Sequence, residues 1–93
     1  MELKDTIKAM QSEDYKDRFI AEYEQLKTRK SKLENTISKH DTGTLDFELA
    51  CPVDILRTQA VYMGLYLDIL KKRAEIENIE IQKMMKQDGK VNA

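Results

Sequence analysis

The second half of this chain is apolar around more of its circumference than one partner helix can cover. From residue 56 onward, apolar residues recur at alternating spacings of four and three, which is typical of a helix that buries one side against another helix. This seam consists of Leu56, Ala60, Met63, Leu67, Leu70, Ala74, Ile81 and Met84, with Glu77 as its one polar interruption. A second apolar stripe runs beside it and contains Ile55, Tyr62, Tyr66, Ile69 and Ile76. The extra stripe predicts that copies of the chain associate.

The first half of the chain carries a matching seam. It alternates four and three residues through Phe19, Tyr23, Leu26, Lys30, Leu33 and Ile37. Gly43 follows this pattern, and glycine readily adopts the left-handed conformation that ends a helix. Pro52 then suits the first position of a new helix, because its missing N–H needs no partner there. Two long helices joined by a short turn are therefore predicted.

These boundaries divide the chain into five segments of one domain, residues 1–93. We expect a short helix at 2–11, a long helix at 13–40, a turn and extended segment at 41–51, a long helix at 52–87 and a frayed tail at 88–93. An antiparallel register pairs Tyr23 with Leu70 and also pairs the polar interruptions Lys16 and Glu77, which have opposite charge. The predicted fold is all-α: a long antiparallel helical hairpin with a short N-terminal helix, assembled into a homo-oligomeric helical bundle.

Charge and composition exclude several functions. The 93 residues include 16 basic and 17 acidic ones, so the basic excess typical of duplex nucleic-acid binding is missing. One histidine, His40, and one cysteine, Cys51, cannot form a zinc set, and neither has the partners that nucleophilic catalysis needs. No apolar run is long enough to span a membrane. We therefore expect no metal, no cofactor, no catalytic residue, no membrane partner and no enzymatic activity.

Lys30 and Gly64 lie at one level of the predicted hairpin, and both are unfavourable choices inside helices. One interpretation is structural: a polar residue in the seam fixes register or oligomeric state, and a glycine lets helices approach closely. The other is a ligand pocket, in which cations bind phosphates and tyrosines stack on a base or ribose. The candidate ligand-binding residues are Lys27, Arg29, Lys30, Tyr62, Tyr66 and Arg73. The sequence leaves both interpretations open.

Several short blocks of this sequence resemble a known family. They are the opening residues 1–7, residues 14–19, Ala21-Glu22-Tyr23, Cys51-Pro52, residues 66–70 and Arg73-Ala74. With these blocks, nearly the whole chain resembles a family of small helical proteins of tailed phages that includes members in crAss-like phages. The resemblance implies a virus-encoded accessory protein that acts in the cytoplasm of the bacterial host. It brings no established catalytic or binding residue to this chain.

The pattern and the resemblance together favour a protein that works by stoichiometric binding. We expect a homo-oligomer that counters bacterial defence by sequestering a small anionic nucleotide signal in pockets of the helical assembly. Two alternatives remain: an inhibitor or adaptor that binds a host protein, and a structural phage component. Neither alternative needs a pocket of basic and aromatic residues, so the surroundings of Lys30, Tyr62 and Tyr66 discriminate among the three.

Overall fold

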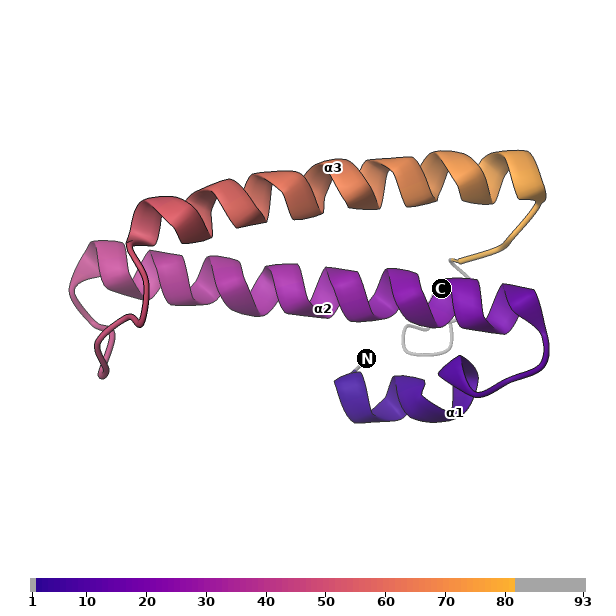
Figure 1. The fold of residues 1–93 in the computed structure, drawn as a ribbon, viewed down its shortest axis with the longest axis horizontal. Coiled ribbons are helices and arrows are strands. Elements are labelled where there is room, and N and C mark those ends of the chain that lie inside the picture. The colour runs from indigo at the N-terminus through magenta and orange to yellow at the C-terminus, as the bar shows by residue number, and fades with distance from the viewer. Residues whose placement is uncertain (1, 82–93) are drawn as a thin grey trace, which may run out of the picture.

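The computed structural model of the protein describes residues 2–81, which form the expected helical hairpin (Figure 1). A short 3-10 helix, η1 (Leu3–Thr6), runs directly into α1 (Ile7–Met10). The long helices are α2 (Tyr15–Thr42) and α3 (Val53–Glu77), and the described residues include no strand. The all-α fold class is thus confirmed.

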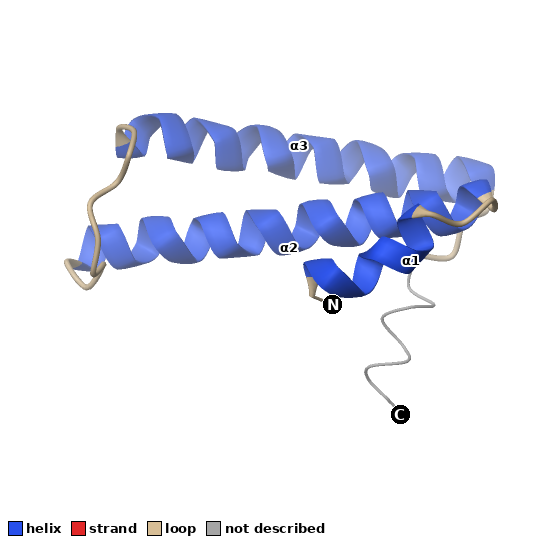
Figure 2. Cartoon of the chain, turned by 60° about the horizontal axis from the view of Figure 1, so that its bottom comes forward, coloured by secondary structure: helices blue, strands red, loops and turns tan. Residues whose placement is uncertain are grey.

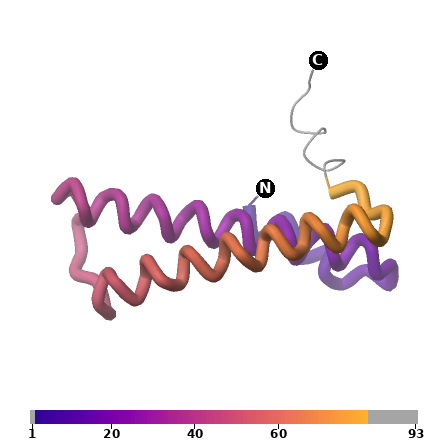
Figure 3. The backbone as a smooth tube through the Cα atoms, turned by 90° about the horizontal axis from the view of Figure 1, so that it is seen from above, coloured from indigo at the N-terminus to yellow at the C-terminus, as the bar shows by residue number. Residues whose placement is uncertain are grey.

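Helix α2 lies between the other elements. Helix α3 runs antiparallel along one side of it, and α1 lies along the opposite side of its N-terminal half (Figures 1 and 2). Thr6 anchors the N-terminal segment to α2, because its fully buried hydroxyl accepts a hydrogen bond of 2.7 Å from Gln25 and donates one of 2.7 Å to the carbonyl of Leu3. Seen from above, α2 and α3 cross at a shallow angle (Figure 3).

Local signals in the sequence set the ends of α2. Asp14 caps its start, with a carboxylate oxygen 2.9 Å from the backbone nitrogen of Lys16. At its other end Gly43 has a φ of 73°, and the backbone nitrogens of Gly43 and Thr44 bond to the carbonyls of His40 and Lys39. Glycine takes this left-handed conformation without the steric cost that other residues bear. The helix therefore ends two residues later than expected.

The end of α3 differs more from the expectation. The helix stops at Glu77 rather than 87, because Asn78 adopts the left-handed conformation with a φ of 57°. The backbone nitrogen of Ile79 then bonds to the carbonyl of Ala74, 2.9 Å away, which closes the last turn. The prediction of a continuous helix was therefore wrong at residues 78–81. Met84 and the expected tail lie outside the described residues.

The main core forms where α2, α3 and the segment after α3 meet. Its buried members are Phe19, Tyr23, Leu26, Leu70, Ala74, Ile79 and Ile81. Five of these belong to the two predicted seams, so the seams meet as expected in this half. Ile79 and Ile81 reach the same core because the chain turns back at Asn78. Burying an apolar side chain of this size stabilises the fold by about 1.5–3 kcal/mol. The turn at Asn78 therefore adds stability by bringing Ile79 and Ile81 into the core.

Candidate functional site

The outer face of α3 is apolar and uncovered by any described part of the chain. Seven large apolar side chains of this helix are between 43% and 75% exposed. They are Ile55, Val61, Tyr62, Leu65, Tyr66, Ile69 and Ile76. Scattered apolar residues are normal on a monomer, whereas a contiguous apolar patch marks an interaction site. This set, which we call the outer face, contains the second stripe that the sequence predicts.

A shallow groove opens on the first half of the outer face, with a volume of about 510 Å³. Its walls are mostly apolar and are formed by Ile55, Thr58, Gln59, Tyr62, Met63 and Tyr66. The two tyrosines offer flat faces for stacking, and Thr58 and Gln59 offer hydrogen-bonding groups. We call this the tyrosine groove, and it is the feature of the single chain best suited to hold a planar ligand.

One edge of α2 reaches α3 beside this groove. Tyr66 donates a hydrogen bond to the carboxylate of Glu22, and seven residues earlier on α2, Tyr15 bonds to Glu77 at 2.7 Å. Residues seven apart lie close to the same edge of a helix. The next residue in this series is Arg29, which is exposed, and the described residues offer its side chain no hydrogen bond or ion pair. Arg29 therefore extends the edge of α2 toward the level of Tyr62.

Arg73 belongs to a compact polar cluster at the far end of the hairpin. Its guanidinium carbon lies 4.9 Å from the centre of the Phe19 ring, and its Nε donates to Glu77 at 3.0 Å. It also donates to the hydroxyl of Tyr15. Hydrogen bonds from Tyr15 and Arg73 lower the pKa of Glu77 below its usual 4.5. Within one chain, these bonds give Arg73 a structural role.

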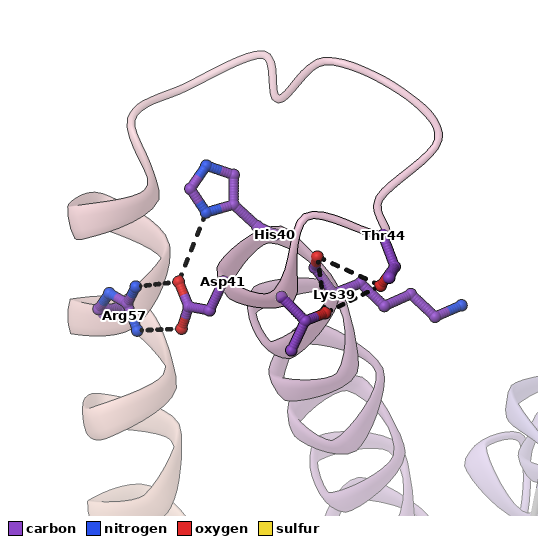
Figure 4. Close-up of polar contacts among 6 residues, drawn as sticks. Lys39, His40, Asp41, Thr44 and Arg57 are labelled. Carbon is purple, nitrogen blue, oxygen red and sulfur yellow. Dashed lines mark hydrogen bonds and ion pairs between the residues drawn. The ribbon is translucent and has the colours of Figure 1, made fainter.

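Lys30 lies on the opposite edge of α2. Its ammonium forms an ion pair of 2.6 Å with Glu34, and its Cε would be 3.2 Å from a Cβ placed on Gly64. The glycine thus makes room for the lysine stem rather than for another helix backbone. Further along, Arg57 holds Asp41 with two hydrogen bonds, which keep the pKa of that carboxyl below its usual 3.8 (Figure 4). These contacts tie the two helices together near the loop.

Lys27 lines a separate groove of about 280 Å³ on α2, with Glu24, Thr28, Ser31 and Lys32. Glu24 is only 4% exposed, and its Oε2 has no hydrogen-bond partner among the described residues. Sequence reasoning missed this buried carboxylate, since its helical position resembles those of many surface glutamates. It also missed Tyr15 and Glu22, although their heptad spacing with Arg29 was a usable signal.

The six predicted ligand-binding residues therefore occupy different places in one chain. Tyr62 and Tyr66 line the tyrosine groove, and Arg29 lies on the same side of the hairpin. Lys30 is on the other edge, and Lys27 is in the separate groove. Arg73 sits in the polar cluster with Tyr15 and Glu77. The structure records no bond between Lys30 and either tyrosine within residues 2–81.

The described residues also bear on metals and membranes. Within residues 2–81, no three His, Cys, Asp or Glu side chains are placed to hold a metal ion. None of the helices in that range is long and apolar enough to cross a membrane.

The fold defines a small all-helical protein with an open, mostly apolar groove on one helix. Residues 13–76 match the family model named Sequestin, which is more than half of the chain, so the protein belongs to the Sequestin family. The family name describes sequestration, a binding function rather than an enzymatic one. No curated protein and no solved structure matches the chain.

Proposed function

We propose that this protein is a non-enzymatic phage accessory protein that counters bacterial defence by sequestering a nucleotide-type immune signal. Copies of the chain assemble into a helical oligomer in the host cytoplasm, and the pockets lie between them. The family name supports the sequestering part of this proposal. The proposed phage origin of the protein rests on the sequence resemblance.

The tyrosine groove is the observation that carries the choice of a nucleotide. Tyr62 and Tyr66 expose aromatic rings in an apolar groove, where a base can stack. Arg29 carries a guanidinium on the same side of the hairpin, and arginine matches the geometry of phosphate oxygens. Stacking beside a phosphate-binding cation is the combination that a nucleotide requires.

The openness of the groove explains why an oligomer belongs to the proposal. Sites that retain small ligands bury most of the ligand surface, and a shallow groove on a single helix leaves a ligand in water. A second copy over the outer face would close the groove. It would also bring further cations, so Lys27, Lys30 and Arg73 remain candidate contacts from other copies.

Thermal-shift and calorimetric titrations with cyclic dinucleotides and ADP-ribose derivatives test the proposal. A ligand present at about 100 times its dissociation constant stabilises the folded protein by about 2.7 kcal/mol, so a true signal raises the melting temperature clearly. Tyr66→Leu preserves apolar bulk but removes the stacking face, and should weaken binding while the protein stays folded and assembled.

Lys30→Ala separates the two interpretations of that residue. If Lys30 contacts the ligand, its loss should weaken binding about ten- to a hundredfold. If its role is structural, affinity should not change. Full affinity and full anti-defence activity in both Lys30→Ala and Tyr66→Leu would refute the groove as the site. In that case, capture of a host protein on the charged surface of the protein becomes the favoured function.

A further inference from the structure

The outer face of α3 has a regular geometry along its whole length. Ile55, Tyr62, Ile69 and Ile76 follow one another at intervals of seven residues and are all more than half exposed. At a rise of 1.5 Å per residue, this row extends for about 32 Å. A seven-residue repeat of this length is suited to a helix packed nearly parallel or antiparallel to α3.

The row reads almost the same in both directions. Reversing it about the midpoint between Leu65 and Tyr66 places Ile55 opposite Ile76 and Tyr62 opposite Ile69. A two-fold symmetric interface requires this kind of self-complementarity, because each patch must accept a copy of itself. The face is therefore suited to a second copy of α3.

Charge favours the antiparallel orientation of that second copy. The polar positions beside the row are Thr58 and Gln59 at the start and Lys72 and Arg73 near the end. Thr58 and Lys72 lie on one flank of the row, and Gln59 and Arg73 lie on the other. Parallel packing would bring opposite flanks together and set Lys72 against Arg73, with like charges repelling each other. Antiparallel packing brings the same flank of each copy together, so it sets Lys72 against the uncharged Thr58, which lines the tyrosine groove. It also places the opposite ends of the two helix dipoles together.

We infer that a second copy packs antiparallel on the outer face and brings its Lys72 to the tyrosine groove. The groove then has Tyr62 and Tyr66 from one copy and a cation from the other, and the two-fold axis creates two identical sites. The site is incomplete in a single chain because Lys72 lies six residues beyond Tyr66 and ten beyond Tyr62 on the same helix, about 9 and 15 Å along its axis. The antiparallel dimer does not depend on the proposed function, whereas the anion-binding role of Lys72 rests on that function.

Disulfide trapping in a Cys51→Ser background tests the orientation. Disulfides form only when the two Cα atoms approach within about 7 Å. Ile55→Cys alone and Ile76→Cys alone should stay unlinked, whereas an equimolar mixture should give a covalent dimer. Leu65→Cys should link to itself, since it lies beside the two-fold axis, and serves as the positive control.

The same method locates Lys72. A mixture of Thr58→Cys and Lys72→Cys should link, and neither variant should link alone. Self-linking of Ile55→Cys would show parallel packing and overturn the inference. The inference also fails if Leu65→Cys and both mixtures remain unlinked, or if the Ile55 and Ile76 mixture links while the Thr58 and Lys72 mixture does not.

A binding measurement with ADP-ribose as the probe then separates this inference from the proposed function. Lys72→Ala should weaken ADP-ribose binding about tenfold and leave the Ile55 and Ile76 cross-link intact. Lys71→Ala is the matched control, because Lys71 is also exposed but is turned about 100° around the helix. Correct cross-links with no binding of ADP-ribose or of any cyclic dinucleotide by the unsubstituted protein would overturn the nucleotide proposal and leave the assembly standing. Binding that Lys72→Ala does not weaken would overturn the role of Lys72.

Discussion

Tyr15 and Glu77 are 62 residues apart in the sequence, yet the tyrosine hydroxyl donates a hydrogen bond of 2.7 Å to the glutamate. The bond joins the first residue of α2 to the last residue of α3, so it fixes the open end of the hairpin. The sequence register had assigned Glu77 to Lys16 instead. Lys16 is exposed, and Glu77 is occupied by Tyr15 and Arg73.

The first prediction concerns acid stability. The pKa of Glu77 is lowered in the folded state by the hydrogen bonds from Tyr15 and Arg73. A carboxyl with a lowered folded pKa stabilises the fold above its unfolded value, and this stabilisation is lost as pH falls through the folded pKa. The melting temperature should therefore fall as the pH drops below the usual glutamate value of 4.5.

Glu77→Gln should lower the melting temperature at pH 7 and flatten its decline toward pH 3. Glu75→Gln is the matched control, since this neighbour is exposed and the described residues give it no hydrogen bond. Thermal unfolding followed by circular dichroism across this pH range measures both effects. An equal pH slope in the unsubstituted protein and Glu77→Gln would contradict the assigned role.

The second prediction compares the effects on stability of replacing Gly64 and Gly43 by alanine. Gly64→Ala should stabilise the protein by up to about 1 kcal/mol, because alanine is the better helix former. The new Cβ meets only the Cε of Lys30, at 3.2 Å, and that flexible stem can shift. Gly43→Ala should destabilise by about 1–2 kcal/mol, since the φ of 73° is costly for a residue with a Cβ.

Urea unfolding of both variants measures these changes in the free energy of unfolding. Adding Lys30→Ala to Gly64→Ala removes the one close contact and should preserve the gain. A loss of stability in Gly64→Ala that Lys30→Ala does not repair would mean that the close approach at Gly64 involves more than this lysine.

The third prediction concerns assembly. Ile69 is 59% exposed at the centre of the outer face, so the predicted association of copies would bury it. Ile69→Glu would place an unpaired charge in that interface and should shift the protein to smaller species. Ile69→Leu is the control that keeps apolar bulk. Sedimentation at micromolar concentration reads out the change, and a monodisperse monomer in the unsubstituted protein would rule out the oligomer.

The fourth prediction uses the separation of two cations on α2. Arg29 lies on the edge nearest the tyrosine groove, whereas Lys27 lines the groove with Glu24. Removing a charged hydrogen bond costs about 1.5–3 kcal/mol, so Arg29→Ala should weaken nucleotide binding by at least tenfold. Lys27→Ala should change it little if the ligand sits in the tyrosine groove. Calorimetry measures both affinities. If Lys27→Ala weakens binding more than Arg29→Ala does, the ligand site lies in the groove that contains Glu24.

The helices and their pairing could be predicted from the sequence because they depend on local signals. The seam through Phe19, Tyr23 and Leu70 repeats with the helical period, and the caps at Asp14 and Gly43 act on adjacent backbone groups. Such signals involve residues a few positions apart, and their free energies do not depend on distant parts of the chain. The second apolar stripe could also be predicted from the sequence, and its exposure in the single chain confirms that α2 covers only one side of α3.

The arrangement of the candidate site was decided by the tertiary structure alone. Whether Lys30 or Arg29 lies on the side of the tyrosines depends on the rotation of α2 about its own axis. A heptad pattern does not fix that rotation to better than a fraction of a turn. The early end of α3 at Asn78 likewise depends on a long-range gain, because burial of Ile79 and Ile81 against Phe19 outweighs the continuation of the helix. The sequence thus determined which residues form helices and which seams meet. Only packing in three dimensions determined which charged residues lie beside which aromatic ones.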